Sequence, residues 1–445
     1  MMKKTVLILT AACSMATLAV QAQKKWTLDE CISYAMEHNL TLQKARLNTQ
    51  SAEEDVKGAR AALLPSLNAH TSQTIGYRPW QENGTVTVTN GKVETKVDKA
   101  YYNGSYGINA QWTLWNGNKN YNTLKQNKLT AEQNAKEAEF TANSIQEQIM
   151  QLYVQILYLT EAVKVNEQSL ETSRKNEERG QQMLEVGKMS KADVAQLTAQ
   201  RATDEYNIVE AKANISKYTV ELKQLLQLTT QDFAVTTPEM SDQQVLEAIP
   251  AMSDVYNSAL AQRPEIASDE LQVKSSELSI KMAKADRMPT LSMNGTLGTS
   301  TNSLSDKEWG NQLKTNFDMS AGLSLSVPIF DQRKTKTAVR KARIQKQQAE
   351  LDLMLTQDNL YKTIEGYWLD AETNQQKFRA AVANVESEQA SYDLLEEQFR
   401  LGLKNIVELM TGKSNLLTAQ QNRLQSKYQT ILAMQMLKFY EGNGI

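Results

Sequence analysis

The chain has 445 residues, and its 49 Lys and Arg residues nearly balance 51 Asp and Glu residues, for a net charge of −2. This balance argues against nucleic acid as a partner, because nucleic-acid-binding proteins usually carry a basic patch. After residue 22 no apolar run approaches the roughly 18 residues that a membrane-spanning helix needs. Any insertion into a membrane must therefore use β-strands.

The N-terminus has the pattern of a secretory signal peptide. Lys3 and Lys4 precede an apolar segment over 5–20, and small residues before Gln23 favour cleavage after Ala22. Residues 1–22 are therefore predicted to be removed. An alternative is acylation at Cys13, but Thr10 and the short apolar core before it disfavour that site. Cleavage after Ala22 leaves Cys31 as the single cysteine, which excludes an intrachain disulfide.

The rest of the chain is an internal duplication. Pro65 aligns with Pro289, Leu114-Trp115-Asn116 with Ile329-Phe330-Asp331, and Gly187 with Gly402. Such self-similarity indicates that one structural unit occurs twice in the chain. We predict a first repeat over 23–228, a second over 254–445, and a polar linker over 229–253 that contains two prolines and has no assigned function.

Each repeat is predicted to contain two strands, at about 66–78 and 101–115 in the first and about 290–300 and 317–329 in the second. Apolar and polar residues alternate along them, most clearly over 102–114 and 317–329. One face is apolar with aromatic residues near its ends, and the other is small and polar, which suits lipid on one side and water on the other. A soluble β-sandwich would show the same alternation.

Long helices are predicted over 116–185 and 332–399. The first has an apolar seam with heptad spacing, formed by Ile145, Ile149, Leu152, Ile156, Leu159 and Val163. Such a helix would be roughly 100 Å long at about 1.5 Å per residue. Shorter helices are predicted over 31–64, 191–228, 264–288 and 405–440, where pairs could stack end to end to match the long ones.

Four membrane strands cannot close a barrel, because the smallest transmembrane barrels have about eight. Open edges cannot face lipid, because unpaired backbone groups there are costly. Two chains would give eight strands with a filled interior, and three would give twelve strands with room for water. The residues alone predict more than one chain and leave the number open.

The signal peptide, the two helix–hairpin–helix–helix repeats, and the paired prolines and glycines together resemble the TolC outer-membrane efflux family over nearly the whole mature chain. The resemblance implies a mainly α fold with a β-barrel: a homotrimer in the outer membrane with a twelve-stranded transmembrane barrel and a periplasmic coiled-coil tunnel. It also implies a passive exit duct of a tripartite efflux pump or type I secretion system. The implied partners are a periplasmic adaptor, an inner-membrane RND or ABC transporter and outer-membrane lipid.

The resemblance further implies a gate at the helical turns. Lys404 and Glu408 match a basic residue that restrains the closed entrance and an acidic residue of a cation-binding ring. Thr411 stands where a second acidic residue is expected, so one ring of three carboxylates is predicted, with Asp193 of the first repeat as the partner of Lys404. Alternatively, these charges only solvate a helical tip. Phe399 replaces a tyrosine that forms a hydrogen bond in relatives.

The turns themselves are the predicted adaptor-docking tips. Gly187 and Gly402 are expected to have φ > 0 at helix C-termini. The apolar residues that flank them are Leu184, Val186, Leu401 and Leu403. Glycine alone indicates a turn, since any helical hairpin could carry it there.

Other functions are less consistent with the sequence. An enzyme is not expected: His38 and His70 lie in a predicted helix and strand, and no metal, cofactor or phosphate-binding motif is recognisable. The 17 Met residues raise copper export as an option, but helical spacing favours core packing. A structural or adhesive coiled-coil protein with a small outer-membrane anchor is the main alternative, which the fold-back of the helices disfavours. A porin would not need so much helix. The cargo is not specified.

Overall fold

The computed structural model describes residues 25–80, 85–89, 92–96, 99–229, 233–238, 241–303 and 305–442. The predicted signal peptide and Cys13 lie outside these residues. The chain divides into two compact units, and each draws segments from both repeats. We call Met1–Ala45, Glu137–Ile266 and Leu355–Ile445 the helical unit, and Arg46–Lys136 and Ala267–Met354 the sheet unit.

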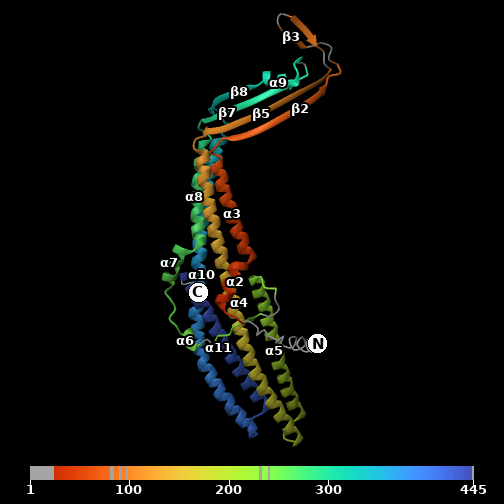
Figure 1. Ribbon diagram of the computed structural model, residues 1–445. Coiled ribbons are helices and arrows are strands. Elements are labelled where there is room, and N and C mark those ends of the chain that lie inside the picture. Colours follow the sequence, from red (N-terminus) through yellow and green to blue (C-terminus); the bar gives the residue numbers. More distant parts are fainter. Residues whose placement is uncertain are drawn as a thin grey trace, which may run out of the picture. The chain divides into compact units, whose positions relative to one another are not determined.

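The sheet unit contains a four-stranded antiparallel sheet in the order β2-β5-β7-β8 (Figure 1). Its strands are β2 (Ser66–Tyr77), β5 (Ala100–Trp115), β7 (Thr290–Asn302) and β8 (Asp318–Ser326), which occupy the four expected regions. The strand expected over 317–329 ends early at Ser326, because Pro328 cannot donate a ladder hydrogen bond. A bulge between Thr113 and Trp115 shifts the register of β5 against β7.

Each strand pair is joined by a segment with structure of its own. Between β2 and β5 lies a hairpin of β3 (Thr85–Thr89) and β4 (Lys92–Lys96). Between β7 and β8 lies the short helix α9 (Trp309–Thr315). Neither was expected. The α9 segment is polar and has no sustained hydrophobic period. Residues 85–89, by contrast, alternate Thr and Val and precede an Asn-Gly pair, a hairpin signal that was missed.

The long helices are α4 (Lys119–Glu185) and α10 (Lys334–Arg400), and each is followed by a return helix, α5 (Lys191–Leu226) or α11 (Ile406–Glu441). The expected heptad seam of α4 is largely buried: Ile145, Ile149 and Ile156 are at most 4% exposed. They pack into the core of the helical unit with Leu222, Phe378 and Met436. No helix among the described residues is long and apolar enough to cross a membrane.

The helix predicted over 31–64 is interrupted. It is observed as α2 (Leu28–His38) and α3 (Leu40–Ala61), with Asn39 in an extended conformation between them. The Asn39 Oδ1 atom accepts the backbone N–H groups of Thr41 and Leu42 at 2.9 and 3.2 Å, so Asn39 caps α3. The second repeat has the same break at Arg263, between α7 (Met252–Gln262) and α8 (Pro264–Ala285).

The segment between the repeats is held against the helical unit. Residues Ala234–Val235 (β6) pair in parallel with Lys25–Trp26 (β1). The short helix α6 (Asp242–Val245) follows, and Asp242 forms ion pairs with Arg423 and Lys427 of α11 at 2.6 and 2.9 Å. Further along, Pro250 accepts the indole N–H of Trp368 at 3.1 Å. The linker is therefore a docked segment with its own secondary structure.

Candidate functional site

The two helical hairpins of the helical unit end in turns of the same geometry. Gly187 has φ +75° and Gly402 has φ +76°, as expected. Behind Gly187, the Lys188 N–H donates to the Met183 carbonyl at 2.8 Å and the Gly187 N–H donates to Leu184 at 3.0 Å. The Gly402 turn repeats this pair of bonds, with donors at 402 and 403 and acceptors at 399 and 398. Both are Schellman turns, which close the last carbonyls of a helix.

Each return helix begins with a capping box. The Ser190 Oγ atom accepts the Asp193 N–H at 3.1 Å, and the Asp193 carboxylate accepts the Ser190 N–H at 3.2 Å. In the second hairpin, Asn405 and Glu408 form the corresponding bonds at 3.0 and 3.2 Å. Both predicted gate carboxylates, Asp193 and Glu408, therefore also cap a helix, because they accept backbone N–H groups that have no partner inside the helix.

In the single chain Lys404 pairs with Glu408, and its predicted pairing with Asp193 stays a prediction. Lys404 Nζ lies 2.6 Å from Glu408 Oε1, four residues further along, and Asp193 accepts hydrogen bonds from Ser190. The short sequence separation and the capping geometry bring Glu408 to Lys404 locally. Their hydrogen bond, together with the Asn405 backbone N–H, lowers the pKa of Glu408 below its ordinary value. Thr411 lies on the second turn of α11, where its hydroxyl donates to the Val407 carbonyl at 2.7 Å.

The apolar residues predicted to form docking tips are accessible. Val186, Leu401 and Leu403 are 68%, 62% and 71% exposed, and Leu184 is half-buried. A Cβ added to either turn glycine would meet no atom within 4 Å. Exposed apolar residues of this kind are unfavourable in water unless a partner covers them.

Behind the tips, the hairpins pack closely through a small cluster that includes Phe399, Tyr392, Ile406 and Leu409. Phe399 is 4% exposed, so its ring packs inside this cluster. A Cβ on Gly180 of α4 would lie 2.5 Å from Leu197 of α5.

A buried ion pair was not anticipated. Lys413 of α11 and Asp204 of α5 are 7% and 2% exposed, and Lys413 Nζ contacts the Asp204 carboxylate directly. Ser173 of α4 donates to the same carboxylate at 2.5 Å, and Gln200 Nε2 donates to Asp204 Oδ1 at 3.1 Å. Burial lowers the pKa of Lys413, although the bond to Asp204 opposes this. The signal was present in the sequence, since both residues interrupt apolar heptad seams.

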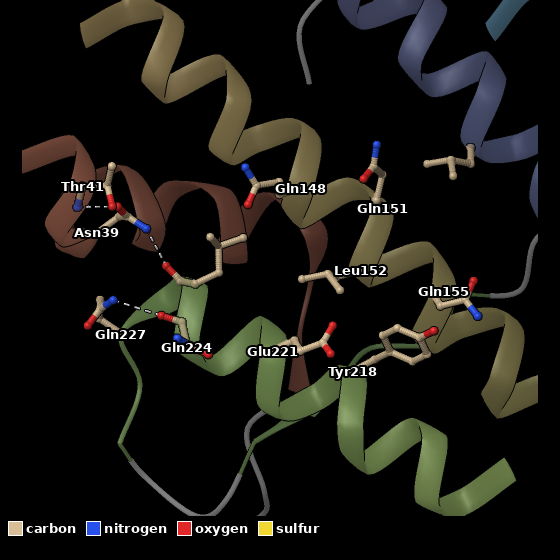
Figure 2. Close-up of a pocket in the computed structure, with 12 residues that line it drawn as sticks. Asn39, Thr41, Gln148, Gln151, Leu152, Gln155, Tyr218, Glu221, Gln224 and Gln227 are labelled. Carbon is tan, nitrogen blue, oxygen red and sulfur yellow. Dashed lines mark hydrogen bonds between the residues drawn. The ribbon is translucent and has the colours of Figure 1, made fainter. Parts of the chain in front are cut away.

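Next to the helix break at Asn39 lies a hollow of about 730 Å³ in the helical unit, and half of the residues that line it are Asn or Gln (Figure 2). Asn39 Nδ2 donates to the Leu225 carbonyl at 2.8 Å, and Gln227, in a left-handed conformation with φ +59°, donates to the Gln224 carbonyl. The corresponding break in the second repeat is filled: Arg263 stacks on Tyr440 and pairs with Glu147 at 2.9 Å. The two repeats therefore differ at their helix breaks: a hollow lies beside Asn39, whereas side chains pack against Arg263.

Comparisons with known proteins agree with this arrangement. The profile of a family described as "Outer membrane efflux protein" matches residues 31–227 and 255–443. The outer membrane efflux protein BepC of Brucella suis is 21% identical over 94% of this chain and 85% of its own length. The alkaline protease secretion protein AprF of Pseudomonas aeruginosa is 22% identical over 92% of this chain and 82% of its own length.

Among solved structures, the channel protein CusC has a TM-score of 0.80 at 15% identity, with 93% of this chain and 91% of that chain covered. This likeness concerns the fold. The family profile covers most of the chain in two segments, one in each repeat. The chain therefore belongs to the outer membrane efflux protein family, and it is an exit duct of the bacterial outer membrane.

Proposed function

We propose that three copies of the chain share one twelve-stranded transmembrane barrel. The observation that carries this proposal is the sheet of four strands with two open edges: within the described residues, β2 pairs only with β5, and β8 only with β7. An open edge in lipid leaves backbone groups without partners at a cost of several kcal/mol each. In a ring of copies, β8 of one chain would pair with β2 of the next and preserve the antiparallel order.

The number three follows from the width of the barrel. Eight strands enclose an interior that side chains fill, and wider barrels leave an aqueous lumen. The polar face of the sheet, with residues such as Asn109, Gln111, Thr296 and Ser320, would line that lumen. Twelve strands are the smallest multiple of four that gives an export route.

The conduit is passive, and the helices of the helical unit would form its periplasmic tunnel. Substrates would be delivered by an inner-membrane RND or ABC transporter through a periplasmic adaptor. The sequence resemblance and the exposed tips support these partners. Leu401 and Leu403 beside Gly402, and Leu184 and Val186 beside Gly187, would be the residues that the adaptor covers.

The periplasmic gate is proposed at the same tips. Three copies of Glu408 would form one ring of carboxylates that attracts cations, and Thr411 contributes no second ring. Lys404 is bonded to Glu408 of its own chain. It therefore neutralises part of the ring, and an ion pair to Asp193 of a neighbouring copy would have to compete with that local bond.

Disulfide cross-linking of the edge strands tests the shared barrel. Ser72 in β2 and Ser320 or Ser324 in β8 lie on the polar face, away from lipid. Cys31 is fully buried and can stay. At least one of the double variants Ser72→Cys/Ser320→Cys and Ser72→Cys/Ser324→Cys should give covalent dimers and trimers in oxidised outer membranes, and nothing larger. Ser72→Cys alone should stay monomeric on the gel. A ladder beyond trimer, or monomer throughout, would contradict the closed barrel.

A further inference from the structure

The register of the sheet determines which residues share a face. Tyr106 of β5 lies opposite Thr299 of β7, Ile108 opposite Leu297, and Trp112 opposite Met293. Directly opposed residues on neighbouring strands point to the same side of a sheet. These residues, together with Met319, Leu323 and Leu325 of β8, form a single apolar face. We call it the apolar face.

The short helix α9 lies on the apolar face and not on the polar one. Thr299 donates a hydrogen bond from its hydroxyl to the Leu313 carbonyl at 2.7 Å. The ring of Tyr106 meets the ring of Trp309 edge to face, with centroids 6.3 Å apart. Thr301, two residues beyond Thr299 and on the same side, is 1% exposed. Both side-chain contacts, from Thr299 and Tyr106, start from the apolar face.

Further hydrogen bonds fix α9 in this position. Gln312 is 4% exposed, and its side chain accepts the Asn302 N–H at 2.8 Å and donates to the Lys307 carbonyl at 2.8 Å. Asn316 Nδ2 donates to the Ser300 carbonyl at 2.7 Å. A helix of seven residues is too short to be stable by itself. Its attachment to β7 is therefore what holds Trp309 in place.

The level of α9 along the strands is also informative. The apolar run of β7 ends at Leu297, and Thr299 and Thr301 follow. At this level stand the aromatic rings of Tyr106 and Phe317, and α9 adds Trp309, which is 53% exposed. Aromatic rings gather where the hydrocarbon of a membrane gives way to its headgroups. At the other end of the strands, the rings of Trp112 and Trp115 stand where the second boundary between hydrocarbon and headgroups is expected.

We propose that α9 is an interfacial helix on the lipid side of the barrel, with Trp309 seated at the boundary between acyl chains and headgroups of the outer leaflet. This inference rests on the proposed function, because it needs a barrel whose apolar face meets lipid. The end of β7 that carries α9 is the end opposite the one that α8 leads into, and in the proposed barrel it is the outer end. The charges around α9, Asp306, Lys307, Glu308 and Lys314, are balanced, so the partner is the lipid boundary itself and not one anionic headgroup.

The opposite placement, with α9 in the lumen as a constriction of the outer mouth, makes different demands. It would need contacts to the polar face, whose side chains at this level include Asn103, Ser105 and Ser300. The hydrogen bonds to 300 and 302 use backbone atoms, and the side-chain contacts from the sheet come from the apolar face. The geometry therefore places α9 outside the barrel.

Quenching of tryptophan fluorescence by brominated lipids tests this placement. The full-length protein, Trp309→Phe and Trp112→Phe are reconstituted into vesicles of phosphatidylcholine brominated either near the headgroup or near the acyl terminus. The emission lost in Trp309→Phe should belong to a component that the shallow bromine quenches at least about twofold more than the deep bromine. Aqueous iodide should quench that component only weakly.

Trp112 separates the two ways in which the experiment can fail. If the Trp112 component is quenched by brominated lipid but the Trp309 component only by iodide, the barrel stands and α9 faces water, which overturns this inference. If brominated lipid quenches neither component, the apolar face does not meet lipid, and the proposed barrel fails with it.

Discussion

Asp204 of α5 and Lys413 of α11 form an ion pair inside the helical unit, which joins a helix of the first repeat to a helix of the second. Ser173 of α4 hydrogen-bonds to both members, so three helices meet at one buried charge pair. Replacing a buried pair with apolar residues is often neutral, whereas removing one partner leaves a buried charge without compensation.

Lys413→Met should therefore lower the free energy of unfolding by about 3 to 5 kcal/mol. The double variant Lys413→Met/Asp204→Leu should recover most of that loss. Thermal unfolding of the detergent-solubilised protein, followed by helical circular dichroism, measures both. Lys212→Met, which breaks the exposed Lys212–Glu167 pair, is the matched control and should change little. A double variant as unstable as the single one would show that the pair itself stabilises the fold.

Acid should release the linker helix α6 from α11. Burial alone would raise the pKa of Asp242, but the ion pairs with Lys427 and Arg423 outweigh it and hold this pKa below its ordinary value of 3.8. A carboxyl with a lowered pKa in the folded state stabilises that state above its ordinary pKa, and the stabilisation is lost as the pH falls through the lowered value. At neutral pH, hydrogen exchange of α6 should be faster in Asp242→Asn than in the original chain. The difference should vanish well below pH 3.8, and a difference that persists there would contradict the role of this carboxylate.

Cation block of the channel should depend on Glu408. In planar bilayers, Glu408→Ala should lower the affinity of a blocking divalent cation added on the tunnel side. Lys404→Met should raise it, because it frees the carboxylate from its partner at 2.6 Å. Glu171→Ala removes another exposed carboxylate, which pairs with Lys175 well away from the turn, and serves as the control. If block is unchanged in both tip variants, the carboxylate ring is wrongly assigned.

The glycines near the tips should differ in what they tolerate. Gly402→Ala meets no neighbour but must keep φ near +76°, which costs about 1 to 2 kcal/mol whatever surrounds it. Gly412→Ala would place its Cβ 2.6 Å from the Leu395 side chain. Its cost, at about 1 kcal/mol or more, should shrink in a Leu395→Ala background. Equal costs of Gly412→Ala in the two backgrounds, measured by thermal unfolding, would rule out this contact as the cause.

The docking tips should be needed for export but not for assembly. Leu403→Asp should abolish adaptor-dependent export in cells while the oligomer stays intact in detergent, because a charge cannot be buried in an apolar interface without a partner. Leu403→Met keeps the apolar surface and should preserve export. Normal export by Leu403→Asp would remove Leu403 from the proposed surface.

The sequence predicted the elements that follow a strong hydrophobic period. The strands and long helices are observed near their expected positions, and β8 ends at Ser326, opposite the first residue of β7 and before Pro328. The break at Asn39 was missed because an asparagine that caps a helix leaves the helical pattern intact on both sides. The helix α9 was missed because its contacts are with a strand and its segment has no period of its own.

At the candidate site, the turns at Gly187 and Gly402 were predicted correctly from glycine, because backbone geometry at a helix end is a local property. Within the single chain Lys404 pairs with Glu408, four residues further along, and its pairing with Asp193 stays a prediction. The Asp204–Lys413 pair joins residues far apart in the sequence, and only the packing of three helices brings them together.

The absolute mass of the protein extracted from the outer membrane in detergent, measured by light scattering with the detergent contribution subtracted, tests the shared barrel most directly. The proposed channel predicts a particle of three chains from that membrane fraction. A stable single chain that needs no detergent would contradict the barrel, because the open edges of β2 and β8 would then have no partner in lipid.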